Sequence, residues 1–461
     1  MKFLYYYRVP LPDPRADAIQ IVNTCAGIAH AGGEVDLRVE SMGAASSADC
    51  LAYYGVDSIG AGRVDISAIG RHWSWPLFDW KTKPAALARL AGPRACLFVR
   101  EVRPYVPGLI ARAHAAGLRV IFEAHNISSS LVREKERKAA QNRAEAPAQA
   151  RTFSMVSPEG KTALRLVGED PGHHDHHDEH DDHDDPARQP ERPPNVDETP
   201  APPPRPVDPT EAKRLARKAQ ERAALEESIL RGADGLICTQ RATLDGLRDA
   251  MKPGVPATVL GNGTITPQPP QKDRHKDIDV LYCGSLKPWK GVDTLVAAMQ
   301  TLFPHKLTVV GPGTKDDVAR LQQAALAVGM VGRLTILPPV KPTEVWDLYA
   351  RAKVGVIPLP DDGYVEARDF TSPLKLFEMM AAGLPIVCSR LKSLQEYVSD
   401  GREVLMVTAD DPRPLAEGLR RVLSDEALRT GLAAAARSRA AEFTWDSRGR
   451  KIVTFAEQLF G

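Results

Sequence analysis

Two series of short apolar segments, each followed by a stretch with helical spacing, constrain the fold of this chain most. The first series contains ACLFVR, GLRVIFEAH and ADGLICT, and the second contains IDVLYCGS, HKLTVVGPG, RLTILPP, KVGVIPL, LPIVCS and EVLMVT. Buried strands that alternate with helices are typical of a parallel sheet with helices on both faces. The sequence therefore predicts an α/β protein with two doubly wound sheets. A ligand is expected between them, at the carboxyl ends of the strands.

The two series meet in the proline-rich segment 267–270. A chain of 461 residues is long enough for two hydrophobic cores. We predict an N-terminal Rossmann-like domain over 1–265 and a C-terminal one over 266–442. The last segment, 443–461, has apolar residues at helical spacing, and we expect it to cross back onto the first domain.

A polar insertion is expected within the first domain, over about 139–209. It contains GHHDHHDEHDDHDD followed by a run of prolines, and such a composition buries too little apolar surface to fold alone. Histidines and acids in this tract can chelate zinc or nickel weakly. Their irregular spacing favours a solvated tract, so we predict disorder and no specific metal site.

The charge balance excludes a general attraction to polyanions. Lys plus Arg number 60 against 59 for Asp plus Glu, so we expect no nucleic-acid partner. No apolar run is long enough to span a membrane, and MKFLYYYRVP is typical of a strand rather than a leader. A cytoplasmic location is predicted, with peripheral contact at the inner face of a membrane left open.

The most informative stretch is DFTSPLKLFEMMAAGLPIV, residues 369–387, which predicts a helix before a buried strand. Thr371 or Ser372 is expected to cap this helix. The N–H groups and dipole of a helix N-terminus suit a phosphate, and Lys375 adds positive charge. Glu378, one turn further, can accept hydrogen bonds from a ribose diol.

A second feature suited to phosphate follows the strand IDVLYC. There the turn GSLKPWKGVDTLV is expected to place Lys290 at the start of a helix, again at a strand's carboxyl end. The alternative for Lys375 and Glu378 is an ordinary solvated ion pair. Two such helix starts on one sheet favour the phosphate site, although neither is a Walker loop.

Together these motifs resemble the nucleotide-sugar domain of retaining glycosyltransferases of family 4, the group 1 type. The resemblance extends through VIFEAHN, LEESILRGADGLICTQ and VLGNGTITP. It implies the GT-B fold, with two Rossmann-like domains and the active site in the cleft between them. It also implies retaining transfer of a sugar from a nucleotide-sugar donor to a glycan, lipid-linked or small-molecule acceptor, without a metal or another cofactor.

The resemblance assigns the donor contacts to the second domain. Lys290 would contact the diphosphate, the turn before the helix and Lys375 would hold it, and Glu378 would bind the ribose hydroxyls. The donor-binding residues implied are Gly284, Ser285, Lys290, Asp369, Thr371, Ser372, Leu374, Lys375 and Glu378.

Two positions depart from the family pattern. Ser285 stands where an Arg is common, five residues before Lys290, and Phe370 stands where a Glu is common. Asp369 or Glu366 is a candidate for the donor sugar instead.

On the acceptor side, His125 in FEAHN follows a strand end. The resemblance places it near the reacting sugar, so that His125, Lys290 and Glu378 form the predicted catalytic set, with a purely structural histidine as the alternative. The aromatic stretch 71–76 is a candidate for shaping the acceptor pocket. Further acceptor-side candidates are Arg8, Asp17, Arg100 and Glu123.

Two other readings remain open from the sequence. One is a non-catalytic GT-B-like scaffold whose histidine-rich loop captures metal or a partner. The other is a sugar-nucleotide epimerase or a sugar-phosphate synthase of the same fold. The joint presence of Lys290, Lys375, Glu378 and His125 favours the transferase over the scaffold.

Overall fold

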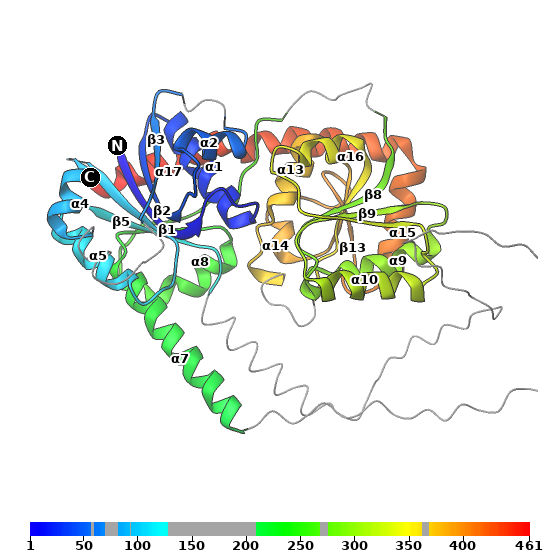
Figure 1. Cartoon of the computed structure of the whole chain (residues 1–461), viewed down its shortest axis with the longest axis horizontal. Coiled ribbons are helices and arrows are strands. Elements are labelled where there is room, and N and C mark those ends of the chain that lie inside the picture. Colours follow the sequence, from blue (N-terminus) through cyan, green and yellow to red (C-terminus); the bar gives the residue numbers. More distant parts are fainter. Residues whose placement is uncertain (57–59, 70–81, 93, 128–208, 268–274, 362–367) are drawn as a thin grey trace, which may run out of the picture. The chain divides into compact units, whose positions relative to one another are not determined.

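Two parallel β-sheets organise the chain in a computed structural model (Figure 1). The structure describes residues 1–56, 60–69, 82–92, 94–127, 209–267, 275–361 and 368–461. The polar insertion, except for Pro209, lies outside these ranges, as do Glu366 and the aromatic stretch 71–76. The predicted α/β class with two doubly wound sheets is confirmed.

The N-terminal sheet has the strand order β3-β2-β1-β4-β5-β6-β7, and the neighbours pair in parallel. The order reverses between β1 and β4, and in such sheets ligands bind beyond the carboxyl ends at the reversal. In that region Tyr5 pairs with both Leu37 and Phe98. The strands are β1 (Lys2–Pro10), β2 (Glu34–Ser41), β3 (Arg63–Ala68), β4 (Ala95–Val99), β5 (Arg119–Ala124), β6 (Gly235–Cys238) and β7 (Ala257–Val259).

Helices cover both faces of this sheet because its strands are apolar on both sides. One core cluster joins β1 to α1, α2 and α17, and the other joins the opposite face to α4, α5, α7 and α8. The bounds are α1 (Ala16–His30), α2 (Ser47–Tyr53), α4 (Pro84–Ala91), α5 (Val106–Ala115), α7 (Pro209–Gly232), α8 (Arg241–Leu247) and the 3₁₀ turn η1 (Arg248–Ala250).

The C-terminal sheet has the order β10-β9-β8-β11-β12-β13, again with parallel neighbours. Its order reverses between β8 and β11, so the residues that follow these two strands hold the position where a ligand is expected. The strands are β8 (Ile278–Cys283), β9 (Leu307–Val310), β10 (Leu334–Leu337), β11 (Ala352–Ile357), β12 (Ile386–Ser389) and β13 (Leu405–Val407).

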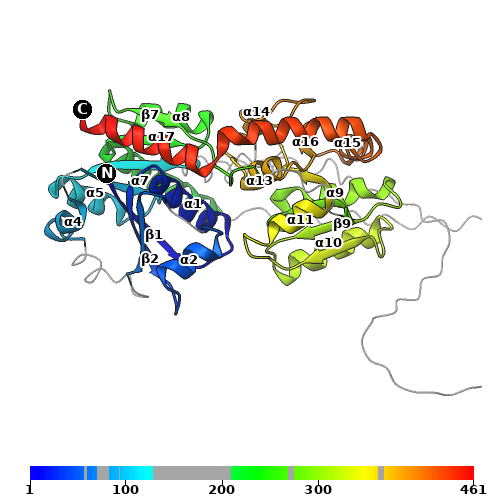
Figure 2. The same cartoon turned by 90° about the horizontal axis from the view of Figure 1, so that it is seen from above.

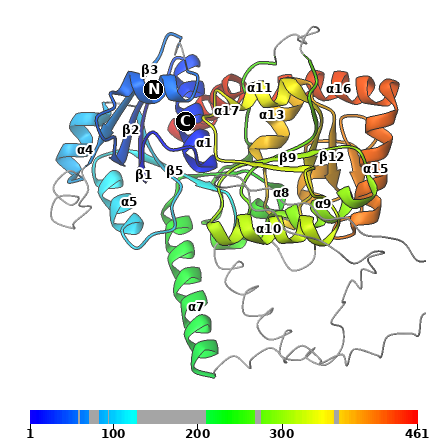
Figure 3. The ribbon, with the colours of Figure 1, turned by 45° about the vertical axis from the view of Figure 1, so that its right-hand side comes forward.

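Figure 3 shows α9, α10 and α15 on one face of this sheet and α11, α13 and α16 on the other. The helices are α9 (Val292–Ala298), α10 (Lys315–Ala327), α11 (Val345–Arg351), α13 (Leu374–Ala382), α14 (Lys392–Gln395), α15 (Pro412–Ser424), α16 (Glu426–Ala440) and α17 (Trp445–Glu457). The 3₁₀ turns are η2 (Pro288–Lys290), η3 (Met299–Thr301), η4 (Ala441–Phe443) and η5 (Gln458–Phe460).

The last helix, α17, packs on the N-terminal sheet rather than on the sheet that precedes it in the chain. It lies beside α1 (Figure 2), and its Ile452 and Phe455 belong to the same core cluster as β1. The two helices approach closely because Gly27 faces Gly449, where neither residue has a side chain to separate them. The end of the chain therefore contributes to the first core.

Two strands and one helix start differ from expectation. The apolar pattern does not predict β3, where Val64 and Ile66 alternate with polar residues, or β7, which has only three residues. Lys290 lies in η2 instead of at a helix start, because Gly291 adopts a left-handed conformation and α9 begins after it. Across the described ranges, no helix combines the length and apolarity that a bilayer crossing requires.

Candidate active site

The start of α13 is open on its N-terminal side. The helix begins at Leu374 with Pro373 in the N-cap position, and no side chain among the described residues caps it. The prediction that Thr371 or Ser372 caps this helix is therefore wrong. Ser372 Oγ instead accepts a hydrogen bond from the backbone N–H of Asn262 at 3.0 Å. The N–H groups at a helix start lack intrahelical acceptors, so this terminus can bind an anion.

The turn before α13 is held by side-chain amides that follow β6 and β7 of the N-terminal sheet. Gln240 Nε2 donates to the carbonyl oxygen of Thr371 at 2.5 Å, and Asn262 Nδ2 donates to that of Ser372 at 2.5 Å. Phe370 packs against the core cluster of α5 and β5. These contacts fix the backbone that leads into the helix, which favours a preformed site.

Lys375, in the first turn of α13, has a buried side-chain amino group. Its Nζ makes no hydrogen bond to any residue that the structure describes, and it lies 3.9 Å from the centre of the Tyr282 ring. Burial, together with the nearby charge of Lys290, lowers the pKa of Lys375 to about 7. The aromatic face compensates only part of the cost of burying an ammonium group. An anionic ligand would supply the missing partner.

A glycine makes room for this ammonium group. Gly284, directly after β8, has a φ of 148°, and a Cβ there would lie 2.7 Å from Lys375 Nζ. The turn folds over Tyr282, whose hydroxyl donates to the carbonyl oxygen of Ser285 at 2.8 Å. Ser285 therefore shapes the turn, while its side-chain oxygen lies 3.4 Å from the backbone nitrogen of Lys287.

Lys290 lies on the second turn of the same site. Its Nζ is 3.8 Å from the centre of the Trp289 ring. Gly291, with a φ of 72°, allows this turn to touch the chain after β11, because a Cβ would overlap the carbonyl oxygen of Pro358. The turn is thereby placed at the reversal point of the C-terminal sheet, where Lys290 is near enough to affect the pKa of Lys375.

Glu378 is oriented by a tyrosine instead of by an ion pair. The hydroxyl of Tyr349, on α11, donates to Glu378 Oε2 at 2.9 Å. Within the described ranges no ion pair joins Glu378 to Lys375. The alternative of an ordinary solvated ion pair between these two residues therefore does not form. Burial raises the pKa of Glu378. Its Oε1 has no protein hydrogen bond there and is able to accept one from a ligand hydroxyl.

The other two donor-side candidates lie in less open positions. Asp369 pairs with its neighbour Arg368, with 2.7 Å between Oδ2 and Nη2. Leu374 is 9% exposed and belongs to the packing at the start of α13.

A second polar cluster lies at the carboxyl ends of β1, β4 and β5. His125 follows β5, and its Nε2 lies 3.2 Å from Gln20 Nε2 on α1 and 3.4 Å from Glu123 Oε2. Burial and the charge of Arg100 lower the pKa of His125 to about 4, against the opposing effect of Glu123. The imidazole is therefore neutral at neutral pH, and its side chain is 20% exposed.

Glu123 is enclosed by other side chains. It is 1% exposed and pairs with Arg448 of α17, while Tyr5 donates to its Oε2 at 3.3 Å. Burial opposes its ionisation, but above all the charge of Arg448 holds the pKa of Glu123 well below its ordinary value. Glu123 also contacts His125, and its predicted place on the acceptor side stays a prediction.

The remaining acceptor-side candidates fall into two groups. Arg100 lies over the ring of Tyr7, 5.7 Å from its centre, and Tyr7 donates to Asp17 Oδ2 at 3.0 Å. Arg100 Nη1 is buried without an acceptor in the part of the chain that is described. Arg8, by contrast, is exposed, with its Nε 3.9 Å from Glu40.

Four residues that support these clusters were not identified from the sequence. Tyr282 contacts Lys375, and Tyr349 contacts Glu378. Each pair is far apart in the sequence, so no local pattern predicts these contacts. Gln20 is buried on α1. Arg448 did carry a signal, since it stands on the apolar face of the last helix between Trp445 and Ile452.

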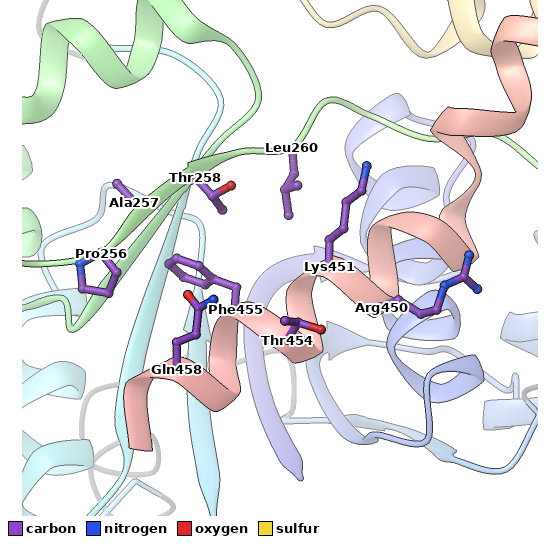
Figure 4. A pocket seen from close by; sticks show the side chains of 9 residues that line it. All are labelled: Pro256, Ala257, Thr258, Leu260, Arg450, Lys451, Thr454, Phe455 and Gln458. Carbon is purple, nitrogen blue, oxygen red and sulfur yellow. The ribbon is translucent and has the colours of Figure 1, made fainter. Parts of the chain in front are cut away.

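The described residues also form a pocket of about 430 Å³ between β7 and α17 (Figure 4). Phe455 and Leu260 give it an apolar lining, and Arg450 and Lys451 contribute basic groups. None of the predicted site residues lines it, so pocket volume does not locate the chemistry. Among the described residues, no cluster of His, Cys, Asp and Glu could hold a metal ion, and the histidine-rich tract lies outside them.

Part of this chain matches a known family. Residues 277–425 match the family model described as glycosyl transferases group 1. A D-inositol 3-phosphate glycosyltransferase of Acidothermus cellulolyticus is 31% identical over 179 residues, 36% of this chain and 38% of that protein. A glycogen synthase of Mycobacterium tuberculosis is 30% identical over 250 residues, 51% of this chain and 56% of that protein. The chain thus spans about half or less of the length of these relatives.

Solved structures resemble the chain over its whole length. Sucrose-phosphate synthase from Thermosynechococcus elongatus has a TM-score of 0.61 at 17% identity, covering 100% of this chain and 99% of that one. HepE of Anabaena, solved in complex with UDP, has a TM-score of 0.60 at 14% identity, covering 99% and 100%. WaaG, a glycosyltransferase involved in lipopolysaccharide biosynthesis, has a TM-score of 0.58 at 15% identity, covering 100% of each chain. The chain has the GT-B fold, as predicted.

Proposed function

We propose that this chain is a retaining glycosyltransferase whose donor is a nucleoside-diphosphate sugar. The observation that carries the proposal is the buried ammonium group of Lys375, which has no acceptor in the described residues and stands at the uncapped start of α13. The family match over 277–425 includes this helix. HepE, which has a similar fold, was solved with UDP and with UDP-glucose, and this supports a nucleotide-sugar donor.

In the proposed reaction the donor diphosphate lies against Lys375, Lys290 and the N-terminus of α13. These groups stabilise the negative charge that develops on the departing phosphate, and they do so where water is largely excluded. They supply the positive charge that a divalent cation would otherwise bring, so we propose transfer without a metal. Glu378, oriented by Tyr349, accepts hydrogen bonds from the ribose.

Retention of configuration needs no protein nucleophile in this scheme. The departing phosphate takes the proton of the acceptor hydroxyl on the same face of the sugar, while the new bond forms there. His125 is neutral at neutral pH and offers a hydrogen bond to the reacting sugar or acceptor. The acceptor is a glycan, a lipid-linked sugar or a small molecule.

Release of nucleoside diphosphate from a panel of UDP-, GDP- and ADP-sugars tests the proposal. One donor should be turned over by the wild-type protein, and His125→Ala should lower turnover while nucleoside diphosphate affinity stays within about threefold, because the residue faces sugar rather than nucleotide. Lys392→Ala, an exposed change on α14, is the control. No release from any donor, with or without sugar acceptors, would contradict the proposal.

Product analysis separates transfer from the other reactions open to this fold. NMR of the products should show the sugar linked to an acceptor with the anomeric configuration of the donor. An epimerised sugar without a new linkage would point to an epimerase, and an inverted linkage would contradict retention.

A further inference from the structure

The last helix places a charged residue in the interior of the first core. On α17 the face toward the N-terminal sheet carries Trp445, Ile452 and Phe455, and Arg448 lies on this same face, 4% exposed. A buried guanidinium group is costly unless it is paired and hydrogen-bonded. The partners of Arg448 therefore show why a charge is kept there.

Arg448 reaches the strand that leads to His125. Its Nη2 donates to Glu123 Oε1, and its Nη1 donates to the carbonyl oxygen of Leu260 at 2.9 Å. The ion pair joins residues that are 325 positions apart in the chain. Both partners are buried, so solvent screens their interaction very little.

The two oxygens of Glu123 serve different neighbours. Oε1 faces Arg448, whereas Oε2 accepts from Tyr5 at 3.3 Å and lies 3.4 Å from His125 Nε2. Gln20 Nε2 is the other neighbour of His125 Nε2, at 3.2 Å. Both neighbours therefore engage one nitrogen of the imidazole. In the described residues Nδ1 has no protein hydrogen bond, which leaves it for a ligand.

We propose that Arg448 is a positioning residue for the glycosyl transfer proposed above, on which this inference rests, and that it acts through the Glu123 carboxylate to hold the His125 ring. Stability alone does not account for the pair, because apolar residues of similar size often replace buried ion pairs without loss of stability. The pair instead sets the charge beside the imidazole.

The groups that face His125 come from four elements, and they predict the direction in which the pKa of His125 should change. Glu123 of β5 raises the pKa of His125, while burial, Arg100 after β4 and Arg448 of α17 lower it, and Gln20 of α1 is uncharged. Removal of Arg448 takes away a positive charge and leaves Glu123 without its partner. Both effects favour the imidazolium, so the titration midpoint of His125 should rise.

The first test is NMR titration of the His125 ring, assigned with a His125→Gln variant, and it needs no substrate. Arg448→Met should raise the midpoint, Arg448→Lys should raise it less, and Arg448→Met combined with Glu123→Gln should bring it back toward the wild-type value. Arg450→Met, an exposed change on the same helix, should leave it unchanged. If Arg448→Met does not fold, Arg448→Lys decides the matter, and an unmoved midpoint in a folded Arg448 variant overturns the proposal.

The second test uses the donor that the wild-type protein turns over. Arg448→Met should lower kcat on the order of tenfold or more per folded molecule, with KM for the donor within about threefold, and should move the acid limb of the kcat profile to higher pH. Partial recovery is expected in Arg448→Lys. A normal kcat despite a shifted His125 midpoint overturns the positioning role. If no donor is turned over, the proposed function fails, whereas the NMR arm still reports on the Arg448–Glu123–His125 contact.

Discussion

At the scale of single residues, two properties of Lys375 support the proposed donor site. Its Nζ is enclosed by Tyr282 and the Gly284 turn, and its pKa is lowered to about 7 by burial and by Lys290. The free protein thus holds this proton weakly at neutral pH. A diphosphate beside the amine favours its charged form, so ligand binding and proton binding are coupled.

Nucleoside diphosphate binding should therefore take up a proton at Lys375. In calorimetry at about pH 8, in buffers of different ionisation enthalpy, wild type should take up nearly one proton, and the affinity should fall as pH rises above about 7. Lys375→Arg, whose charge is permanent, should bind without this uptake and without this fall in affinity. Equal proton uptake in wild type and Lys375→Arg would show that another group titrates.

The sequence identifies the charged residues of this site but not the groups that orient them. Lys290, Lys375 and Glu378 stand in two local motifs, and local motifs are visible in a single sequence. Tyr282 and Tyr349 act through space, from a strand and a helix that only the fold brings together. The sequence predicts Glu123 on the acceptor side from its strand position, whereas its pairing with Arg448 is visible only in the fold.

At the scale of elements, periodicity predicts most strands because they are short, apolar and bounded by turns. It fails for β3, whose charged residues alternate with Val64 and Ile66, and for the three-residue β7. The cap of α13 was misassigned because Ser372 can serve either its own helix or Asn262, and only the tertiary structure decides between them.

The crossing of α1 and α17 gives an element-scale prediction. Gly449→Ala should destabilise the protein by about 1 to 3 kcal/mol, because its Cβ would overlap the backbone of Gly27. The control is Gly431→Ala on α16, where no atom lies within 4 Å and which should stabilise by about 0.5 to 1 kcal/mol. Urea unfolding midpoints measure both. Equal gains in the two variants would contradict the close approach of these helices.

At the scale of the whole molecule, each of the two sheets has parallel strands and one reversal in strand order. Each sheet places a polar cluster at the carboxyl ends of its strands. One contains Lys290, Lys375 and Glu378, and the other contains His125 and Arg100. The proposed division of labour follows from this arrangement, with the nucleotide at the first cluster and the sugar acceptor at the second. The two doubly wound sheets were predictable because both apolar series repeat the same pattern, whereas the GT-B fold was implied by the resemblance of the motifs to a known family.

The proposed chemistry uses neither a metal nor the histidine-rich tract. Deletion of residues 172–208 should leave donor turnover within about twofold of wild type, and a chelator should leave it unchanged, since lysines and a helix terminus neutralise the diphosphate. The matched control is chelation of the deletion variant. Activity that chelation removes, that zinc or manganese restores and that is absent from the deletion variant would show a working metal site in the tract.

The most direct test of the donor site is calorimetric titration of UDP, GDP and ADP into wild type, Glu378→Gln and Lys290→Ala, with the exposed Lys392→Ala as control. One nucleotide should bind wild type and the control alike. Each site variant should lose about 1.5 to 3 kcal/mol of binding free energy, a loss of about ten- to 150-fold in affinity, because each removes a charge-assisted contact. Unchanged affinity in both site variants, or no binding of any of the three nucleotides to wild type, would contradict the account.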